Sequence, residues 1–306
     1  MAKIRIAVIT GPTATGKTAL GVELCKRLDG EVVGADSMQI YKGMVIGTAA
    51  PTEEEMQGIP HHLIGVVDPK NSFSVADYVN LASEAIEDIS GRGKLPVLVG
   101  GTGLYISSLL SGTDFTGFEG DPDLRLALEE EFRQDPQAVF EKLVKADPEA
   151  AQKLHINNSK RVIRALEVYY STGKPISQWT RDNRKQPPYD SRIIALNFHS
   201  RPTLYDRINR RVDNMIEAGL QSEVNRLVAE GVPQNATAMQ AIGYKELVGV
   251  GREELQGAIE TIKMNSRRYA KRQLTWLRRD PAVNFLYVDE LSGGQLLETA
   301  IKIIEG

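Results

Sequence analysis

The segment Gly11-Pro12-Thr13-Ala14-Thr15-Gly16-Lys17-Thr18 fits the pattern G-x-x-x-x-G-K-[ST] at every position. The apolar residues 4–9 before it predict a buried strand, and residues 19–24 after it begin a helical pattern. This context is typical of a P-loop, in which backbone N–H groups converge on an anion at the N-terminus of a helix. A turn that binds no ligand is the alternative interpretation.

The P-loop interpretation predicts a site for a di- or triphosphate, and it makes ATP one candidate ligand. Lys17 supplies a positive charge to such a site, and the Thr18 hydroxyl can ligate Mg²⁺. The expected phosphate-binding residues are Gly11, Thr13, Ala14, Thr15, Gly16, Lys17 and Thr18.

The chain has 306 residues, which is enough for two domains or for one domain with a large insertion. Cys25 is its only cysteine, so the chain cannot form an internal disulfide or a zinc cluster of cysteines. It has no run of about 18 apolar residues, and the first strand starts directly after the N-terminus. We therefore expect no membrane segment, no signal peptide and a cytoplasmic location.

The net charge of −3 is unevenly distributed along the chain. Residues 121–149 carry nine acidic and four basic side chains, whereas residues 153–185 carry eight basic and two acidic ones. Residues 263–279 carry seven basic side chains and no acidic one. A solvated helix face explains any one of these basic blocks. Two such blocks in a chain with a phosphate site favour a polyanionic partner such as a nucleic acid.

Apolar strands alternate with helical segments, which predicts a right-handed parallel α/β sheet. An amphipathic helix is expected from Ser74 to about Ile89. The expected strands cover residues 4–9, 31–35, 62–67, 95–99 and 193–198. Further helices are expected at about 202–217, 221–230, 240–248 and 253–277.

The alternation stops between residue 121 and about residue 177, where every segment has a helical pattern and Asp-Pro pairs separate the segments. A polar linker around residues 183–190 then leads back to an apolar strand. The expected fold is therefore a P-loop NTPase-like parallel sheet interrupted by an all-helical insertion. We place the core at residues 1–113 and 190–306 and the insertion at residues 114–189.

Polar residues follow two of the predicted strands, Asp36-Ser37 after Ala35 and Thr102 after Val99. Ligands of parallel sheets bind beyond the carboxyl ends of the strands, so these side chains should lie near the phosphate. Asp36 can organise Mg²⁺ or act as a general base, and a capping aspartate in a turn is the alternative. The segment Gly101-Thr102-Gly103 is by itself also a common turn.

An ATPase of the P-loop class has an apolar strand that ends in an aspartate, which serves Mg²⁺ and the attacking water. The strand predicted at residues 95–99 is followed by Gly100 instead. This absence favours a P-loop that holds a departing diphosphate over one that positions a γ-phosphate for transfer.

The last long predicted helix combines arginines with an aromatic residue. Arg268, Arg272 and Arg279 are spaced by helical intervals of 4, 8 and 11 residues to share one face with Trp276. Arginine beside an aromatic ring is suited to single-stranded RNA, because it neutralises phosphates while the ring stacks on bases. A core tryptophan surrounded by arginine stems is the alternative.

With these residues assembled, the chain resembles the tRNA dimethylallyltransferase family over nearly its whole length. One departure is Gly65, where the family usually has an aspartate after His-His-Leu-Ile. The resemblance is carried by GPTATGKT (11–18), ADSMQIY (35–41), HHLIG (61–65), GGTGLY (100–105), RVIRALEVY (161–169), RRVDNMI (210–216), QAIGYKE (240–246) and RRYAKRQLTWLRR (267–279).

The resemblance implies a prenyl transfer from dimethylallyl diphosphate to the exocyclic amine of adenine 37, 3′-adjacent to the anticodon, in tRNAs that read codons beginning with U. It implies that Asp36 accepts a proton from that amine, and that Thr102 and Arg211 stabilise the departing diphosphate. It further implies Mg²⁺ as cofactor, the tRNA anticodon stem-loop as partner and a monomer.

The same resemblance implies that the helical insertion clamps one side of the anticodon stem and that the core contacts the other side. The implied tRNA contacts are Asp36, Ser37, Met38, Gln39, Thr102, Arg125, Ser159, Lys160, Arg161, Arg164, Gly243, Tyr244, Lys245, Lys271, Arg272, Gln273, Trp276 and Arg278.

Two other functions fit parts of the sequence. A P-loop kinase of a small metabolite would turn over ATP and would not need a basic C-terminal helix. A nucleotide-switched RNA-binding protein would need a response to ATP, yet the chain lacks the aspartate that a hydrolytic P-loop protein uses.

Overall fold

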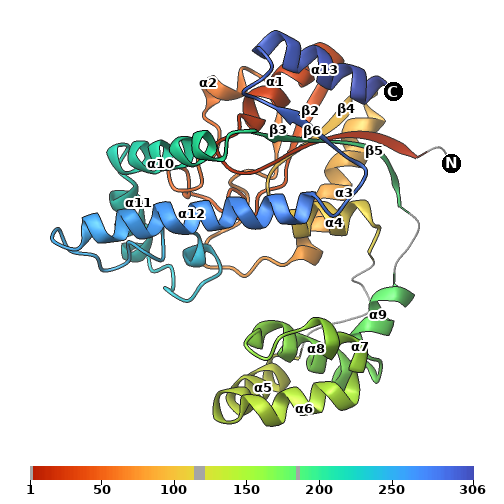
Figure 1. Ribbon diagram of the computed structural model, residues 1–306, viewed down its shortest axis with the longest axis vertical. Helices are drawn as coiled ribbons and strands as arrows, with labels where there is room; N and C mark the ends of the chain where they lie inside the picture. Colours follow the sequence, from red (N-terminus) through yellow and green to blue (C-terminus); the bar gives the residue numbers. More distant parts are fainter. Residues whose placement is uncertain (1–2, 114–120, 184–186) are drawn as a thin grey trace. The chain divides into compact units, whose positions relative to one another are not determined.

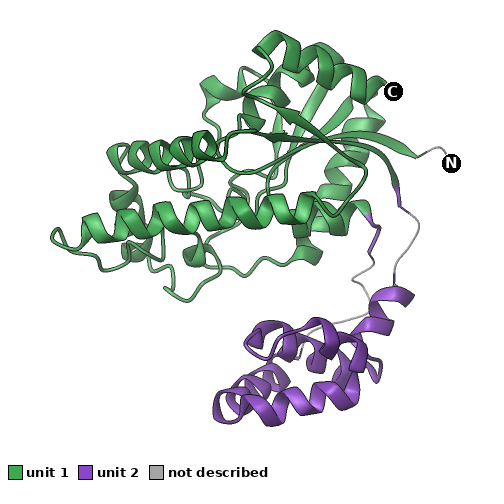
Figure 2. Cartoon of the chain, viewed as in Figure 1, with its two compact units in different colours: residues 1–110, 189–306 green, residues 111–188 purple. Residues whose placement is uncertain are grey.

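The computed structural model describes residues 3–113, 121–183 and 187–306, and the chain divides into two compact units (Figure 2). Unit 1 comprises residues 1–110 and 189–306, and unit 2 comprises residues 111–188. These boundaries lie within three residues of those that we placed from the sequence. Arg184 and Lys185, two members of the basic block at residues 153–185, lie outside the described residues.

Unit 1 is built on a six-stranded sheet of order β3-β2-β4-β1-β5-β6, in which every pairing is parallel (Figure 1). The parallel α/β core expected from the sequence is thus confirmed. The strands are β1 (Ile4–Thr10), β2 (Gly30–Gly34), β3 (His61–His62), β4 (Leu95–Val99), β5 (Tyr189–Asn197) and β6 (Val283–Tyr287).

Helices cover both faces of this sheet, because successive residues of β1 are apolar and point to opposite faces, so both faces need an apolar cover. Ile6 and Val8 belong to the core beneath α3 and α11, whereas Ala7 and Ile9 pack with α1 and α13. The helices of unit 1 are α1 (Lys17–Leu28), α2 (Glu53–Met56), α3 (Val75–Gly91), α4 (Gly103–Leu110), α10 (Arg201–Glu217), α11 (Leu220–Ala229), α12 (Leu255–Leu277) and α13 (Gly293–Glu305).

The strand predicted at residues 62–67 is mostly wrong, because β3 ends at His62. Leu63 has φ 62°, which turns the chain out of the sheet. The following residues hydrogen-bond instead to the segment after β2, with Gly65 N–H donating to the Gln39 carbonyl at 2.8 Å. Gly65 itself has φ 61°, a conformation that suits glycine.

The helix predicted at residues 240–248 is also wrong. A short 3₁₀ helix spans Ala238–Gln240, and turns follow it. Ala241 is extended at ψ 145°, and Gly243 has φ 100°, so neither residue can continue a helix. Strand β6 and helix α13 were not predicted from the sequence.

The regular elements of unit 2 from residue 121 to residue 183 are all helices. Each of its first three helices starts at a proline that follows an aspartate, and the Asp121, Asp135 and Asp147 side chains accept backbone N–H bonds there. A core that includes Leu143 and Leu166 joins them. The helices are α5 (Pro122–Gln134), α6 (Pro136–Ala146), α7 (Pro148–Lys153), α8 (Ser159–Thr172) and α9 (Ile176–Asp182).

Candidate active site

The P-loop joins β1 to α1 at the carboxyl edge of the sheet. Gly11 has φ 133°, and a Cβ there would lie 2.3 Å from the Leu196 carbonyl oxygen, so the loop can pass β5 only with glycine at this position. Gly16 has φ 88° and directs the first N–H groups of α1 toward the loop. The backbone therefore has the shape that an anion-binding loop needs.

Lys17 folds back over this loop, and its Nζ donates to the Pro12 carbonyl at 2.8 Å. The Thr15 hydroxyl donates to the same carbonyl at 2.9 Å. Burial and the nearby Arg211 lower the pKa of Lys17 to about 8, although Asp36 opposes this shift. The ammonium group thus lies where a bound anion would restore its lost solvation.

Helix α10 brings two arginines to the same place. Arg207 Nε donates to the Ala14 carbonyl of the P-loop at 3.0 Å. Arg211, one helical turn further along, donates from Nη2 to the Thr48 carbonyl at 3.4 Å. Burial lowers the pKa of Arg211, and the charge of Asp36 counteracts that effect. Two cations from different helices, Lys17 and Arg211, therefore share one partly desolvated site.

Asp36 follows β2 and faces these cations. Its Oδ1 accepts hydrogen bonds from the backbone N–H groups of Met38 at 2.9 Å and Gln39 at 3.3 Å. Within the described ranges its Oδ2 accepts no hydrogen bond. Asp36 therefore does accept backbone N–H bonds in a turn, as the alternative weighed from the sequence required, and its second oxygen has no such bond among the described residues. Thr102 Oγ1 accepts from the Ser37 N–H at 2.9 Å and donates to the Ser37 hydroxyl.

Helix α12 packs directly on the glycine-rich segment after β4. A Cβ on Gly103 would lie 2.6 Å from the Trp276 ring, so the indole rests on that backbone. Gln273 Nε2 donates to the Gly101 carbonyl at 2.9 Å. Gln273 is only 7% exposed, which makes its side chain a support for this segment in the present structure.

The segment around residue 244 contributes less surface than the sequence suggested. Gly243 is buried, and Tyr244 is 0% exposed with its hydroxyl donating to Glu223. Neither residue presents a surface to RNA in this conformation. Lys245 is exposed. The side chain of Tyr244 thus belongs to the core, and only that of Lys245 is available at the surface.

The basic side chains of α12 and that of Arg278, directly after its end, include paired and unpaired ones. Lys263 pairs with Asp213 at 2.7 Å, and Arg267 contacts Asn209 on α10. Lys271, Arg272 and Arg278 are exposed and form no ion pair with any described residue. The Arg272 guanidinium lies over the Tyr269 ring, 5.5 Å from its centroid. The C-terminal half of α12 thus offers unpaired charge beside an aromatic ring.

In unit 2 some of the expected RNA contacts are unpaired, whereas others form ion pairs. Lys160 and Arg161 are exposed and have no ion-pair partner among the described residues. Arg164 donates to Glu167 Oε2 at 3.1 Å, and Arg125 lies 4.0 Å from the same oxygen. The Glu167 side chain is 1% exposed, so these two arginines stabilise a buried carboxylate. Ser159 starts α8 next to Lys160.

Three residues with a place in the site were missed from the sequence. Arg207 is four residues before Arg211, and this helical spacing could have revealed it. Tyr269 is four residues before Gln273; its hydroxyl donates to the Gly101 carbonyl at 3.4 Å, and burial and Asp36 raise its pKa. No local pattern marks Glu223, whose partners are far away in the sequence.

Comparison with known proteins gives one consistent picture. The chain is 48% identical over 309 residues to a tRNA dimethylallyltransferase of Thermoanaerobacter pseudethanolicus, covering 99% of this chain and 98% of that protein. A tRNA isopentenylpyrophosphate transferase structure from Bacillus halodurans matches with a TM-score of 0.73 and 45% identity, covering 99% and 97% of the two chains. A eukaryotic dimethylallyltransferase solved while acting on tRNA matches with a TM-score of 0.84 and 32% identity, covering 98% of this chain and 78% of that one.

The sheet and its phosphate loop define a P-loop protein of the α/β class with a prenyltransferase-like architecture. The family model described as IPP transferase matches residues 39–280, and the one described as isopentenyl transferase matches residues 4–66. The chain belongs to the tRNA dimethylallyltransferase family, whose members are prenyltransferases.

The pKa of Lys17 predicts that anion binding depends on pH. Its protonated fraction falls from about nine-tenths at pH 7 to about one-tenth at pH 9 if its pKa is about 8. We expect the affinity for inorganic pyrophosphate, measured by calorimetry, to fall about tenfold over that range. In Lys17→Arg the guanidinium keeps its charge, so the fall should be much smaller. An equal fall in both proteins would exclude Lys17 as its cause.

Proposed function

We propose that this chain transfers the dimethylallyl group of dimethylallyl diphosphate to the exocyclic amine of adenine 37 in tRNA, in tRNAs that read codons beginning with U, and releases diphosphate. One observation carries the proposal. Lys17 and Arg211 face Asp36 at the carboxyl edge of the sheet, and β4 is followed by Gly100, which has no carboxylate to activate water. Such a site suits a departing diphosphate better than a γ-phosphate.

In the proposed reaction the adenine amine loses a proton and the prenyl donor loses its diphosphate. The amine nitrogen attacks the allylic carbon while the bond from that carbon to the diphosphate oxygen breaks. Asp36 Oδ2 accepts the proton that the amine loses. Lys17, Arg211 and Thr102 stabilise the negative charge that develops on the diphosphate. Because a neutral adenine amine is a weak nucleophile, positioning of the two substrates supplies much of the rate.

The residues of the P-loop fit Mg²⁺ as part of this proposal. The Thr18 side chain lies at the start of α1 and makes no hydrogen bond to another described residue. In the described parts of the chain no group of three or more His, Cys, Asp or Glu residues can hold a metal ion. Thr18 and the diphosphate oxygens would therefore hold Mg²⁺, which would supply charge neutralisation at the leaving group.

The proposal assigns the RNA contacts to exposed cations. In unit 1 these are Lys245, the α12 residues Lys271 and Arg272, and Arg278 directly after α12. In unit 2 the first turn of α8 presents Lys160 and Arg161, and we propose that this unit clamps the anticodon stem. A monomer and a cytoplasmic location belong to the same proposal. None of the described helices is long and apolar enough to cross a membrane.

The proposed donor can be tested directly. Dimethylallyl diphosphate labelled in its prenyl group is incubated with unmodified tRNA, and ATP is offered as the competing donor. We expect label in the tRNA and none in a tRNA that carries guanine at position 37. We expect no phosphate release from ATP that depends on tRNA. Stoichiometric, tRNA-stimulated release of phosphate from ATP would instead support the kinase or ATPase alternatives.

The role of Asp36 predicts a specific kinetic defect. Asp36→Asn keeps an oxygen that can accept the Met38 N–H, so the fold and tRNA affinity should change little. Turnover should fall at least about a hundredfold, because the amide cannot accept the proton. Single-turnover rates with saturating donor measure this effect. Near-normal turnover would mean that Asp36 only shapes the turn or organises Mg²⁺.

The two arginines of α8 should behave differently when neutralised. Arg161→Gln should reduce the slope of log tRNA affinity against log salt by about 0.7–0.9 and leave the melting temperature unchanged. Arg164→Gln should lower the free energy of unfolding by about 1–2 kcal/mol, because buried Glu167 loses a partner that is itself only partly buried. An unchanged salt slope in Arg161→Gln would contradict a clamp that uses this residue.

A further inference from the structure

The segment at residues 43–49 has no regular helix or strand, yet α11 holds its backbone closely. Glu223 Oε2 accepts hydrogen bonds from the N–H groups of Val45 and Ile46, both at 3.0 Å, and Oε1 accepts from Gly47 at 3.1 Å. Arg226, three residues further along α11, donates to the Gly43 carbonyl at 2.7 Å. One face of α11 therefore binds backbone N–H groups of this segment through Glu223 and a backbone carbonyl through Arg226.

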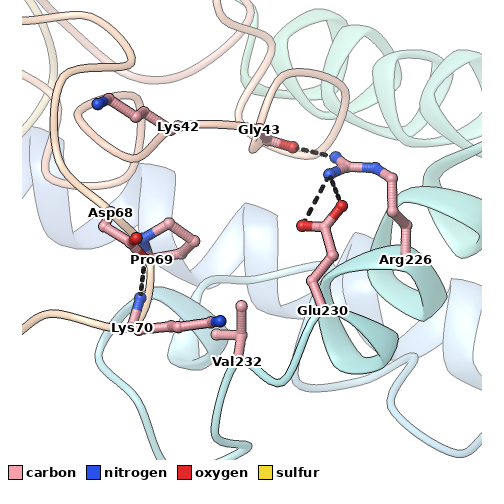
Figure 3. Close-up of a pocket in the computed structure, with 8 residues that line it drawn as sticks. All are labelled: Lys42, Gly43, Asp68, Pro69, Lys70, Arg226, Glu230 and Val232. Carbon is pink, nitrogen blue, oxygen red and sulfur yellow. Dashed lines mark hydrogen bonds and ion pairs between the residues drawn. The ribbon is translucent and has the colours of Figure 1, made fainter.

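Figure 3 shows the arginine half of that arrangement at the edge of an open groove of about 510 Å³. Arg226 reaches from α11 to Gly43 and is held in turn by Glu230 at 3.0 Å. Glu223, in contrast, is only 7% exposed and has no ion-pair partner among the described residues. Its negative charge is therefore compensated by backbone N–H dipoles and a hydroxyl rather than by a cation.

That hydroxyl belongs to Tyr244, which donates to Glu223 Oε1 at 2.5 Å. Burial and the carboxylate raise the pKa of Tyr244, so it stays protonated and donates. Its ring also lies against Gly47, where an added Cβ would be 2.4 Å from the Tyr244 Cε2 atom. Glu223 is thus surrounded by donors from two segments that are about 200 residues apart in the sequence.

The segment that Glu223 holds leads directly to the candidate active site. The Thr48 carbonyl, one residue after Gly47, accepts from Gln39 Nε2 at 3.1 Å and from Arg211 Nη2 at 3.4 Å. The Ala49 carbonyl accepts a second bond from Gln39 at 3.0 Å. The positions of the Arg211 guanidinium and of Gln39 therefore depend on where this backbone lies.

We propose that Glu223 is a positioning residue: it fixes the 45–49 backbone so that the Thr48 carbonyl orients Arg211 toward the diphosphate. This inference rests on the proposed function for the identity of the anion only. The Glu223→Gln variant would replace one acceptor oxygen, which accepts from two or three donors, with an NH₂ group that cannot accept from them. The segment would then shift, and Arg211 would lose its orienting carbonyl.

Glu31 offers a matched control for stability. Like Glu223 it is almost fully buried, at 2% exposure, and it is held by Arg92 and by His62 Nε2 at 2.9 Å. Glu31 is the second residue of β2 and lies at the amino end of the parallel strands. The P-loop follows the carboxyl end of β1, so the two are at opposite ends of the sheet. Glu31→Gln should therefore destabilise the protein without reaching the anion site.

The test measures the affinity for inorganic pyrophosphate by calorimetry and the melting temperature of each variant. We expect Glu223→Gln to weaken pyrophosphate binding about tenfold, which is the effect of losing one charged contact. Glu31→Gln should stay within about twofold of the unmodified protein although its melting temperature falls. Tyr244→Phe, which removes one donor and keeps the carboxylate, should weaken binding about threefold and serves if Glu223→Gln does not fold.

A double-variant cycle tests the route through the arginine. In an Arg211→Gln background, Glu223→Gln should cause little further loss of affinity, because the group that it positions is gone. An equal loss with and without Arg211, or unchanged affinity in both Glu223→Gln and Tyr244→Phe, would overturn the proposal. If pyrophosphate binding follows the expected pattern but no prenyl group reaches tRNA, the positioning role stands and the proposed reaction fails.

Discussion

The concentration of positive charge in a partly desolvated loop is the constraint on which the site depends. Lys17 and Arg211 come from different helices; burial lowers the pKa of both, and the charge of Arg211 lowers the pKa of Lys17 further. Asp36 opposes this effect on both pKa values, and Glu55 also opposes it on the pKa of Arg211. An arrangement of this kind is most favourable when an anion lies between the cations. In the proposed function, the P-loop, helix α10 and the end of β2 therefore act together as the binding site for the diphosphate.

Helices α11 and α12, which lie far beyond the P-loop in the sequence, support the segments around this site. Gln273 and Trp276 of α12 pack on the glycine-rich segment that carries Thr102. Glu223 of α11 holds the 45–47 backbone next to Thr48. The side chains of these helices supply hydrogen bonds to backbone groups of two segments that lie outside regular strands and helices. The exposed basic side chains of α12 then remain available for a polyanion.

Local sequence patterns predicted much of this architecture, because the P-loop, the buried strands and the Asp-Pro helix starts are determined by neighbouring residues. The wrong predictions fall where contacts between residues distant in the sequence determine the local backbone structure. Leu63 leaves the sheet because the next residues pair with the segment after β2, and Gly243 interrupts a helical pattern so that Tyr244 can reach Glu223. The carboxylate of Glu223 has partners in two distant segments, so no spacing in the sequence could reveal it.

The central claim is that the P-loop releases an intact diphosphate. Phosphorus NMR of a reaction with dimethylallyl diphosphate and unmodified tRNA measures this product directly, and mass spectrometry of the tRNA counts the modified adenines. The account predicts one inorganic diphosphate for each adenine that gains a prenyl group, with the P–O–P bond unbroken. Orthophosphate as the primary product, or diphosphate release without alkylated adenine, would contradict it.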